Sequence, residues 1–168
     1  TQGGTVLKPR IAIDGYNLAL EQGTGIATYA RILSQRLGAM GAEVGVLYGQ
    51  RGASAKDELL REIMLLDARQ PKPMWIERAL RDVIGKHKLR FGATARPVPV
   101  TDRVIRRGLE ARTPHAERMW NVVDLYRMAQ LASAPGRPFA RVRLPEGPQV
   151  MHWTFPLPIR VEGARNIY

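Results

Sequence analysis

Hydrophobic and polar positions follow two different periods along this chain, which predicts a mixture of strands and helices. Short apolar runs predict buried strands at residues 11–13 and 43–48. Between them, apolar residues recur every three to four positions, which predicts a helix over residues 24–40 with Thr24 as its N-cap. The predicted apolar face of this helix consists of Ile26, Tyr29, Ala30, Leu33 and Leu37. The opening segment therefore predicts one right-handed βαβ unit, and hence a parallel sheet.

The middle of the chain predicts mainly helices. Helical periodicity extends over residues 57–68 and again over residues 73–85. Residues 96–100 are predicted to be extended, because each proline fixes its own φ and restricts the residue before it. A long helix is predicted over residues 114–133, with Thr113 as its N-cap. The predicted core stripe of that helix consists of Met119, Trp120, Val123, Tyr126 and Ala129.

The last part of the chain predicts strands again. Residues 139–144 predict a short edge strand, and residues 149–153 predict a buried strand that ends in a proline-rich loop. Residues 164–168 predict the start of another strand. Strands that alternate with helices are typical of α/β proteins. We therefore expect a Rossmann-like parallel sheet flanked by helices, in a single domain that spans residues 1–168.

Composition narrows the classes of partner. With 45% hydrophobic and 24% charged residues among 168, the chain can bury one sizeable core. It has no cysteine, which excludes disulfides, thiolate zinc sites and cysteine nucleophiles, and is compatible with a reducing cytoplasm. The formal net charge is +11, carried mostly by arginine. Such a charge favours nucleic acid, a phospholipid surface or a diphosphate-bearing substrate, and it does not choose among them.

The glycine-rich turn after the first predicted strand is a candidate binding site. Gly23, Thr24 and Gly25 lead directly into the first predicted helix. A helix N-terminus offers unpaired N–H groups and the positive end of its dipole, which together hold a phosphate or a sugar hydroxyl. The alternative is a strand-to-helix turn that needs glycine only for its dihedral angles.

Three further residues are candidates for the same site. Asp14 and Asn17 follow the first strand, and His152 ends a later one. Ligands of α/β sheets bind outside the carboxyl ends of the strands, where these residues are expected. Asp14 could instead accept backbone N–H bonds in a turn, and His152 could be a core histidine bonded to the backbone. No His-x-x-x-His or carboxylate cluster has metal-ligand spacing, so no metal site is predicted.

Several segments carry a resemblance to a known family. They are Ile-Ala-Ile-Asp-Gly at residues 11–15, Gly-Thr-Gly-Ile-Ala-Thr-Tyr at 23–29, Met-His-Trp-Thr-Phe-Pro-Leu-Pro at 151–158 and Ala-Arg-Asn-Ile-Tyr at 164–168. Together they resemble the amino-terminal half of bacterial group 1, or family 4, glycosyltransferases. The resemblance is dense at the two ends of the chain and thin between them.

The resemblance implies a GT-B fold, in which two Rossmann-like domains face a cleft. The amino-terminal domain mostly holds the acceptor, and the carboxy-terminal domain holds the nucleotide-sugar, a co-substrate rather than a cofactor. Gly23, Thr24 and Gly25 match the family loop that approaches the donor diphosphate and sugar, and His152 matches a recurring histidine. The implied reaction is retaining transfer of a hexose to a bacterial surface saccharide or a lipid-linked acceptor. The implied location is cytoplasmic, with peripheral contact at the anionic inner face of the membrane.

The chain also departs from the family pattern. The Thr-x-His-Asp segment that usually follows a strand like residues 165–168 is absent, and so is the Glu-x7-Glu signature of the nucleotide-sugar domain. Catalytic residues therefore stay unassigned, and this chain alone is expected to be inactive. Its expected partner is the carboxy-terminal half of the same enzyme or a second copy, because an open cleft exposes apolar surface. The alternative function is a non-catalytic, basic Rossmann-like module that binds nucleotide or nucleic acid.

Overall fold

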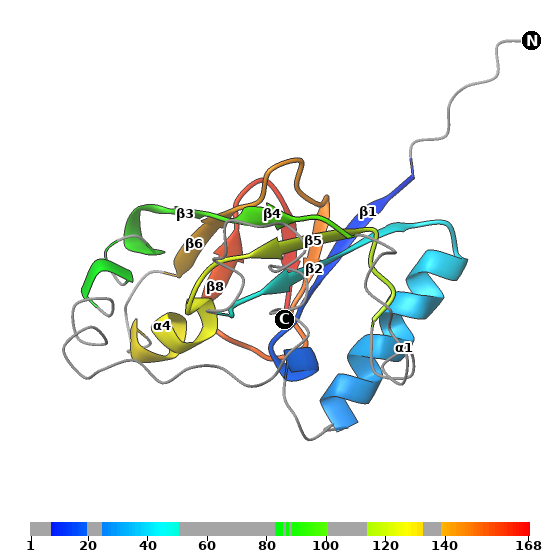
Figure 1. Ribbon diagram of the computed structural model, residues 1–168, viewed down its shortest axis with the longest axis horizontal. Coiled ribbons are helices and arrows are strands. Elements are labelled where there is room, and N and C mark those ends of the chain that lie inside the picture. The colour runs from blue at the N-terminus through cyan, green and yellow to red at the C-terminus, as the bar shows by residue number, and fades with distance from the viewer. Residues whose placement is uncertain are drawn as a thin grey trace, which may run out of the picture.

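The chain folds as an α/β protein with helices on a mixed, mostly parallel sheet, which is consistent with a Rossmann-like fold (Figure 1). This computed structural model describes residues 8–19, 25–50, 83–85, 87, 89–100, 114–132 and 139–168. The predicted fold class is confirmed. The predicted helices at 57–68 and 73–85 lie outside the described residues, except for a helical turn at 83–85. Within the described ranges, none of the helices has the length and apolar character to cross a membrane.

The main sheet has six strands in the order β4-β5-β2-β1-β7-β9. Their bounds are β1 (Arg10–Asp14), β2 (Glu43–Tyr48), β4 (Arg96–Val98), β5 (Arg118–Asn121), β7 (Val150–His152) and β9 (Arg165–Ile167). Every neighbouring pair is parallel except β4 and β5, which are antiparallel. The strands predicted at both ends of the chain and the extended segment at 96–100 are confirmed. The carboxyl ends of five strands consequently meet at one edge of the sheet.

A second, smaller sheet has three parallel strands in the order β3-β6-β8. They are β3 (Ala93–Thr94), β6 (Ala140–Arg143) and β8 (Ile159–Val161). The strand predicted at 139–144 is confirmed as β6, but the prediction that it is an edge strand is wrong. The proline-rich loop returns as β8 and pairs with one side of β6, while β3 pairs with the other. Neither partner has enough alternating apolar residues to be recognised from the sequence.

Helix α1 (Gly25–Ala39) follows the 3-10 turn η1 (Asn17–Ala19) and connects β1 to β2, which confirms the predicted βαβ unit. The predicted apolar face is wrong in part. The buried residues of α1 are Ala27, Ala30 and Ser34, whereas Ile26 and Tyr29 are exposed. Small side chains let the helix approach the sheet closely. The buried Ser34 hydroxyl is satisfied, because it donates to the carbonyl of Arg31 and accepts the N–H of His115.

The long helix predicted over residues 114–133 is wrong. Residues 118–121 form strand β5, and helix α4 (Leu125–Ala132) begins only after Asp124, whose φ is +58°. Met119 and Trp120 are buried as predicted, but on opposite faces of a strand. The apolar positions fit both periods over this short stretch, and pairing with β2 and β4 decides for the strand.

The core lies on both faces of the main sheet, because successive residues of each strand point in opposite directions. One cluster, beneath α1, includes Ile13, Val46 and Met119. The other includes Ala12, Leu47, Trp120 and Met151, and packs against α4 and the smaller sheet. Figure 1 shows α1 on one side of the main sheet and α4 with β6 and β8 on the other. This three-layer packing fixes the carboxyl edge between α1 and α4.

Candidate site at the carboxyl edge of the main sheet

Asp14 and His152 lie at the carboxyl ends of the neighbouring strands β1 and β7, where the register places Ile13 opposite His152. This is the edge at which α/β sheets bind ligands. Helix α1 also begins here, because β1 leads into it through η1. The structure therefore brings Asp14, His152 and Gly25, the first residue of α1, to one edge.

Asp14 is 1% exposed and holds the loops after β1 and β7 together. Its Oδ1 accepts the N–H of Tyr16 at 3.2 Å. Its Oδ2 accepts the hydroxyl of Thr154 at 2.8 Å and also the Thr154 N–H. Burial raises the pKa of Asp14, and the hydrogen bonds from Thr154 and Tyr16 offset part of that rise. Asp14 thus accepts backbone N–H bonds in a turn, as the alternative interpretation predicts. It supports the carboxyl edge without being exposed itself.

Tyr126 anchors the same loop from α4. Its hydroxyl accepts the N–H of Gly15 at 3.1 Å and donates to the carbonyl of Leu47. Burial raises the pKa of Tyr126 well above its ordinary value, so the phenol stays protonated as a donor. Sequence reasoning missed this role. The available signal was a tyrosine within an apolar helical stripe, because a buried hydroxyl needs a partner.

Tyr29 and His152 form the exposed part of the edge. The Tyr29 hydroxyl lies 3.2 Å from Nε2 of His152, and the ring centroids are 6.1 Å apart. Tyr29 is 50% exposed, and His152 is half-buried. The expectation from the helical pattern that Tyr29 packs on the sheet is wrong. Among the described residues, the side chain of His152 bonds to a side chain and not to the backbone, so it differs from the core histidine of the alternative interpretation. A phenol and an imidazole thus face solvent together.

Asn17 is an unusual buried amide beside this edge. It is 5% exposed, and its Nδ2 finds no hydrogen-bond partner within the described structure. The amide of Asn121, at the end of β5, by contrast has partners: it accepts the N–H of Gln50 and donates to the Gln50 carbonyl, both at 2.8 Å. A buried N–H donor without a partner is energetically costly. Asn17 is therefore a candidate donor to a bound polar group.

Gly25 is the first residue of α1, and the fold does not require a glycine there. A Cβ at this position would meet no described atom within 4 Å, and its φ is outside the left-handed region. Gly41, just after α1, has a φ of +86° and does need glycine. The predicted loop residues Gly23 and Thr24 lie outside the described residues. The dihedral angles of Gly25 itself therefore do not require glycine.

Two aromatic rings lie next to the buried carboxylate. Tyr16 and Phe155 stack at 4.8 Å with an interplanar angle of 26°, and both are half-buried. Tyr16 also meets Tyr126 edge to face at 5.2 Å. The loops that Asp14 joins therefore also pack through their rings. The loops after β1 and β7 are thus attached to each other both by hydrogen bonds and by ring packing.

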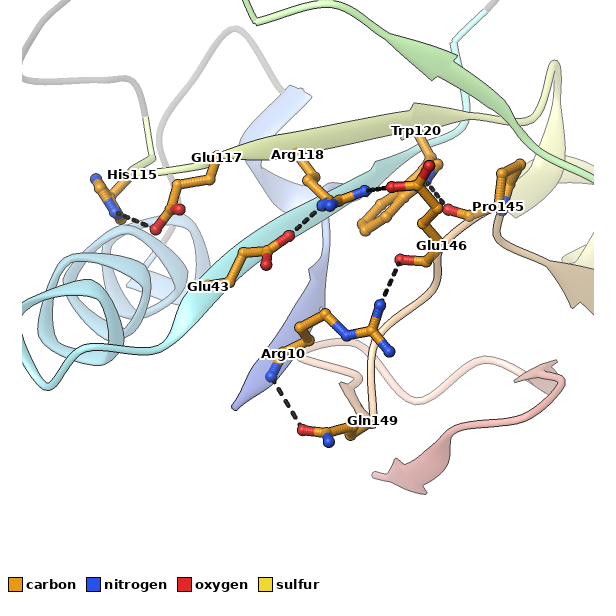
Figure 2. Close-up of polar contacts among 9 residues, drawn as sticks. All are labelled: Arg10, Glu43, His115, Glu117, Arg118, Trp120, Pro145, Glu146 and Gln149. Carbon is orange, nitrogen blue, oxygen red and sulfur yellow. Dashed lines mark hydrogen bonds and ion pairs between the residues drawn. The ribbon is translucent and has the colours of Figure 1, made fainter. Parts of the chain in front are cut away.

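The opposite, amino edge of the sheet has a different character (Figure 2). Arg118 forms ion pairs with Glu43 and Glu146, and Arg10 donates to the carbonyl of Glu146 at 3.4 Å. The indole of Trp120 donates to the carbonyl of Pro145 at 3.1 Å. These contacts tie the starts of β1, β2 and β5 to the turn before β7. Arg118 is neutralised by two carboxylates and Arg10 bonds to a backbone carbonyl, which indicates a structural role for this edge.

Within the described ranges, no group of three or more histidine and carboxylate side chains is placed to hold a metal ion. The described chemistry of the carboxyl edge is that of hydrogen bonding: an imidazole, two phenols, an amide and a helix N-terminus. Comparisons with family models, curated proteins and solved structures find no match to this chain.

Proposed function

We propose that this chain is the acceptor-side domain of a retaining GT-B glycosyltransferase. The enzyme would transfer a hexose from a nucleotide-sugar to a bacterial surface saccharide or a lipid-linked acceptor. The observation that carries the proposal is the meeting of Tyr29 and His152 beside the glycine-rich start of α1. The resemblance of residues 11–29 and 151–168 to that family supports it independently.

The start of α1 suits the diphosphate of the donor. Four N–H groups at the beginning of an α-helix have no partner within the helix, and its dipole favours an anion. No described atom lies within 4 Å of the position that a Cβ on residue 25 would take. A diphosphate carried on the facing domain could then approach the backbone closely. In this role the helix stabilises the charge that develops as the nucleoside diphosphate leaves.

Tyr29 and His152 suit the hydroxyl groups of a saccharide. The imidazole can donate or accept according to its tautomer, and the phenol does both. Because the pair is joined at 3.2 Å, each ring orients the other toward solvent at the carboxyl edge. We assign the pair to acceptor binding and orientation, which lowers the barrier by positioning the attacking hydroxyl. The catalytic residues stay unassigned.

The experiment is a transfer assay on the full-length gene product that carries this chain. Purified enzyme is incubated with UDP-hexoses and GDP-hexoses in turn, and release of nucleoside diphosphate is measured with and without a membrane extract as acceptor source. The proposal expects release with one nucleotide-sugar, stimulated by the extract. Nucleotide or oligonucleotide binding with no release from any of these donors would instead favour the non-catalytic binding module.

A further inference from the structure

Buried polar side chains gather at the carboxyl edge of the main sheet. Among the described residues, every buried aspartate, asparagine and glutamine lies there, namely Asp14, Asn17, Gln50, Asn121 and Asp124. They end or follow the strands β1, β2 and β5. Buried amides and carboxylates are normally hydrogen-bonded, because an unpaired polar group in the interior costs free energy. The partners of these side chains therefore show whether they serve the fold alone.

Two amides at this edge keep a buried atom that has no hydrogen-bond partner in the described part of the chain. These atoms are Nδ2 of Asn17 and Oε1 of Gln50, and each residue is 5% exposed. The amide of Asn121, by contrast, is bonded to the backbone of Gln50 through both its oxygen and its nitrogen. For the fold alone, apolar side chains of similar size would cost less at residues 17 and 50 than unpaired amides. Two such amides at one edge point to a ligand that pairs with them.

The two amides follow neighbouring strands of the sheet. β1 pairs with β2, and beyond the last paired residues the N–H of Gly15 donates to the carbonyl of Leu47 at 2.8 Å. The ring of Tyr48 lies against Gly15, because a Cβ at Gly15 would come within 2.6 Å of it. Asn17 follows Gly15 by two residues, and Gln50 follows Tyr48 by two. Since two residues span at most about 7 Å, the backbone at both amides stays close to this contact.

The unpaired atoms specify the charge of their ligand. Nδ2 of Asn17 needs an acceptor, whereas Oε1 of Gln50 needs a donor. The diphosphate of a nucleotide-sugar offers only acceptor oxygens and an ammonium group offers only donors, so neither would pair with both atoms. A hydroxyl group pairs with both through one oxygen. The buried carboxyl group of Asp14, in the same loop as Asn17, further disfavours an anion.

We propose that Asn17 and Gln50 form a subsite for one hydroxyl group of the acceptor saccharide. Asn17 donates to the hydroxyl oxygen, and the hydroxyl donates to Gln50. The choice of a saccharide rests on the proposed function, and the subsite is separate from the start of α1 that suits the donor diphosphate. Both amides then determine specificity, because an acceptor that lacks this hydroxyl leaves them unpaired.

The test measures binding without turnover, by ligand-observed NMR on the full-length gene product. The probes are the methyl glycosides of glucose, galactose and mannose, together with their monodeoxy analogues. We expect at least one parent glycoside to bind, and one of its monodeoxy analogues to bind roughly tenfold more weakly. Asn17→Leu and Gln50→Met should each bind that parent roughly tenfold more weakly and no longer distinguish it from the analogue. The matched control is Gln149→Met at the amino edge, which should bind both as the wild type does.

Thermal unfolding distinguishes a ligand-binding amide from a structural one. Asn17→Leu and Gln50→Met remove unpaired atoms, so their melting temperatures should equal or exceed that of the wild type. Asn121→Leu is the comparison, because it leaves the N–H and the carbonyl of Gln50 unpaired and should lower the melting temperature. A fall in the first two variants as large as in Asn121→Leu would overturn the proposal, since the two amides would then be bonded within the folded chain.

Three binding results would also overturn it. The first is that no glycoside binds the wild type. The second is that both amide variants bind every glycoside as the wild type does, which would assign the amides to internal water. The third is that the variants still discriminate against the monodeoxy analogue, which would place its hydroxyl elsewhere. The expected binding pattern without release of nucleoside diphosphate from any donor would support the subsite and contradict the transferase proposal.

Discussion

The hydroxyl of Tyr29 lies 3.2 Å from Nε2 of His152, although the two residues are 123 positions apart in the sequence. This bond joins the second turn of α1 to the end of β7 at the solvent-exposed part of the carboxyl edge. Beneath it, Asp14 and Tyr126 hold the adjoining loops without being exposed themselves. The site thus consists of an exposed pair on a buried polar support, and the two layers can be tested separately.

Replacing Tyr29 by phenylalanine tests the exposed pair. The substitution removes only the hydroxyl of a half-exposed ring, so the free energy of unfolding should change by less than about 0.5 kcal/mol. The 15N resonances of the His152 imidazole should shift, because Nε2 loses its partner. Tyr168→Phe is the control, since its hydroxyl bonds to the carbonyl of Ile159 instead. An unchanged His152 spectrum in Tyr29→Phe would show that the bond is absent in solution.

Replacing Asp14 by alanine tests the buried support. The substitution leaves the N–H groups of Tyr16 and Thr154 without their acceptor, which should lower the free energy of unfolding by about 1–3 kcal/mol. Thr154→Val removes a single hydroxyl donor and should cost about 1 kcal/mol. Urea unfolding measures both. If Asp14→Ala were as stable as the wild type, these hydrogen bonds would not hold the loops.

The stability of the protein should depend on pH through Asp14. Burial raises its pKa in the folded state above the ordinary value of 3.8, so the folded state binds more protons just above that pH. Its contribution to stability is therefore fully present below 3.8 and is lost as the pH rises through the folded-state pKa. Asp14→Asn does not titrate at this position. The unfolding free energy of the wild type minus that of Asp14→Asn should become more positive as the pH falls from neutrality toward 4. A difference that does not change with pH would contradict this.

Two glycines should respond in opposite ways to alanine. A Cβ at Gly45, in the middle of β2, would overlap the indole ring of Trp120, so Gly45→Ala should lower stability by about 1–3 kcal/mol. Gly25→Ala meets open space at a helix start and should be neutral or stabilising by up to about 1 kcal/mol. Thermal unfolding distinguishes the two.

The same Gly25 substitution separates folding from function. If a donor diphosphate approaches the backbone at this position, Gly25→Ala should slow release of nucleoside diphosphate while its thermal stability is kept. If Gly25→Ala were stable and released nucleoside diphosphate as fast as the wild type, the lack of a side chain at residue 25 would have no role in function.

Patterns of strand and helix at the two ends of the chain were enough to predict the βαβ unit and the α/β class. The pattern failed over residues 114–133, where a strand and a short helix share apolar spacing and only pairing with β2 distinguishes them. It also failed for Ile26 and Tyr29, because the sheet accepts the small face of α1 rather than its large apolar residues. Both errors arise from long-range packing, which overrides local periodicity.

The candidate site was predictable to a similar extent. Asp14 and His152 could be placed at one edge, because the carboxyl ends of parallel strands lie together. The residues that form hydrogen bonds at this edge could not be predicted. Thr154 is 140 positions from Asp14 in the sequence, and Tyr126 is 111 positions from Gly15. Such contacts depend on the strand order. No pattern in the sequence specifies that β7 lies beside β1.

The most direct test of the proposed function compares His152→Ala with the wild type in the full-length gene product. Release of nucleoside diphosphate from the preferred nucleotide-sugar is measured over a range of acceptor concentrations, with Tyr168→Phe as the control, because its hydroxyl bonds to the carbonyl of Ile159. We predict that His152→Ala loses acceptor-stimulated release by roughly tenfold or more while its thermal stability is retained, because it removes a group that positions the acceptor. Acceptor-stimulated release at the wild-type rate in His152→Ala would contradict the assignment of the carboxyl edge as the site of glycosyl transfer.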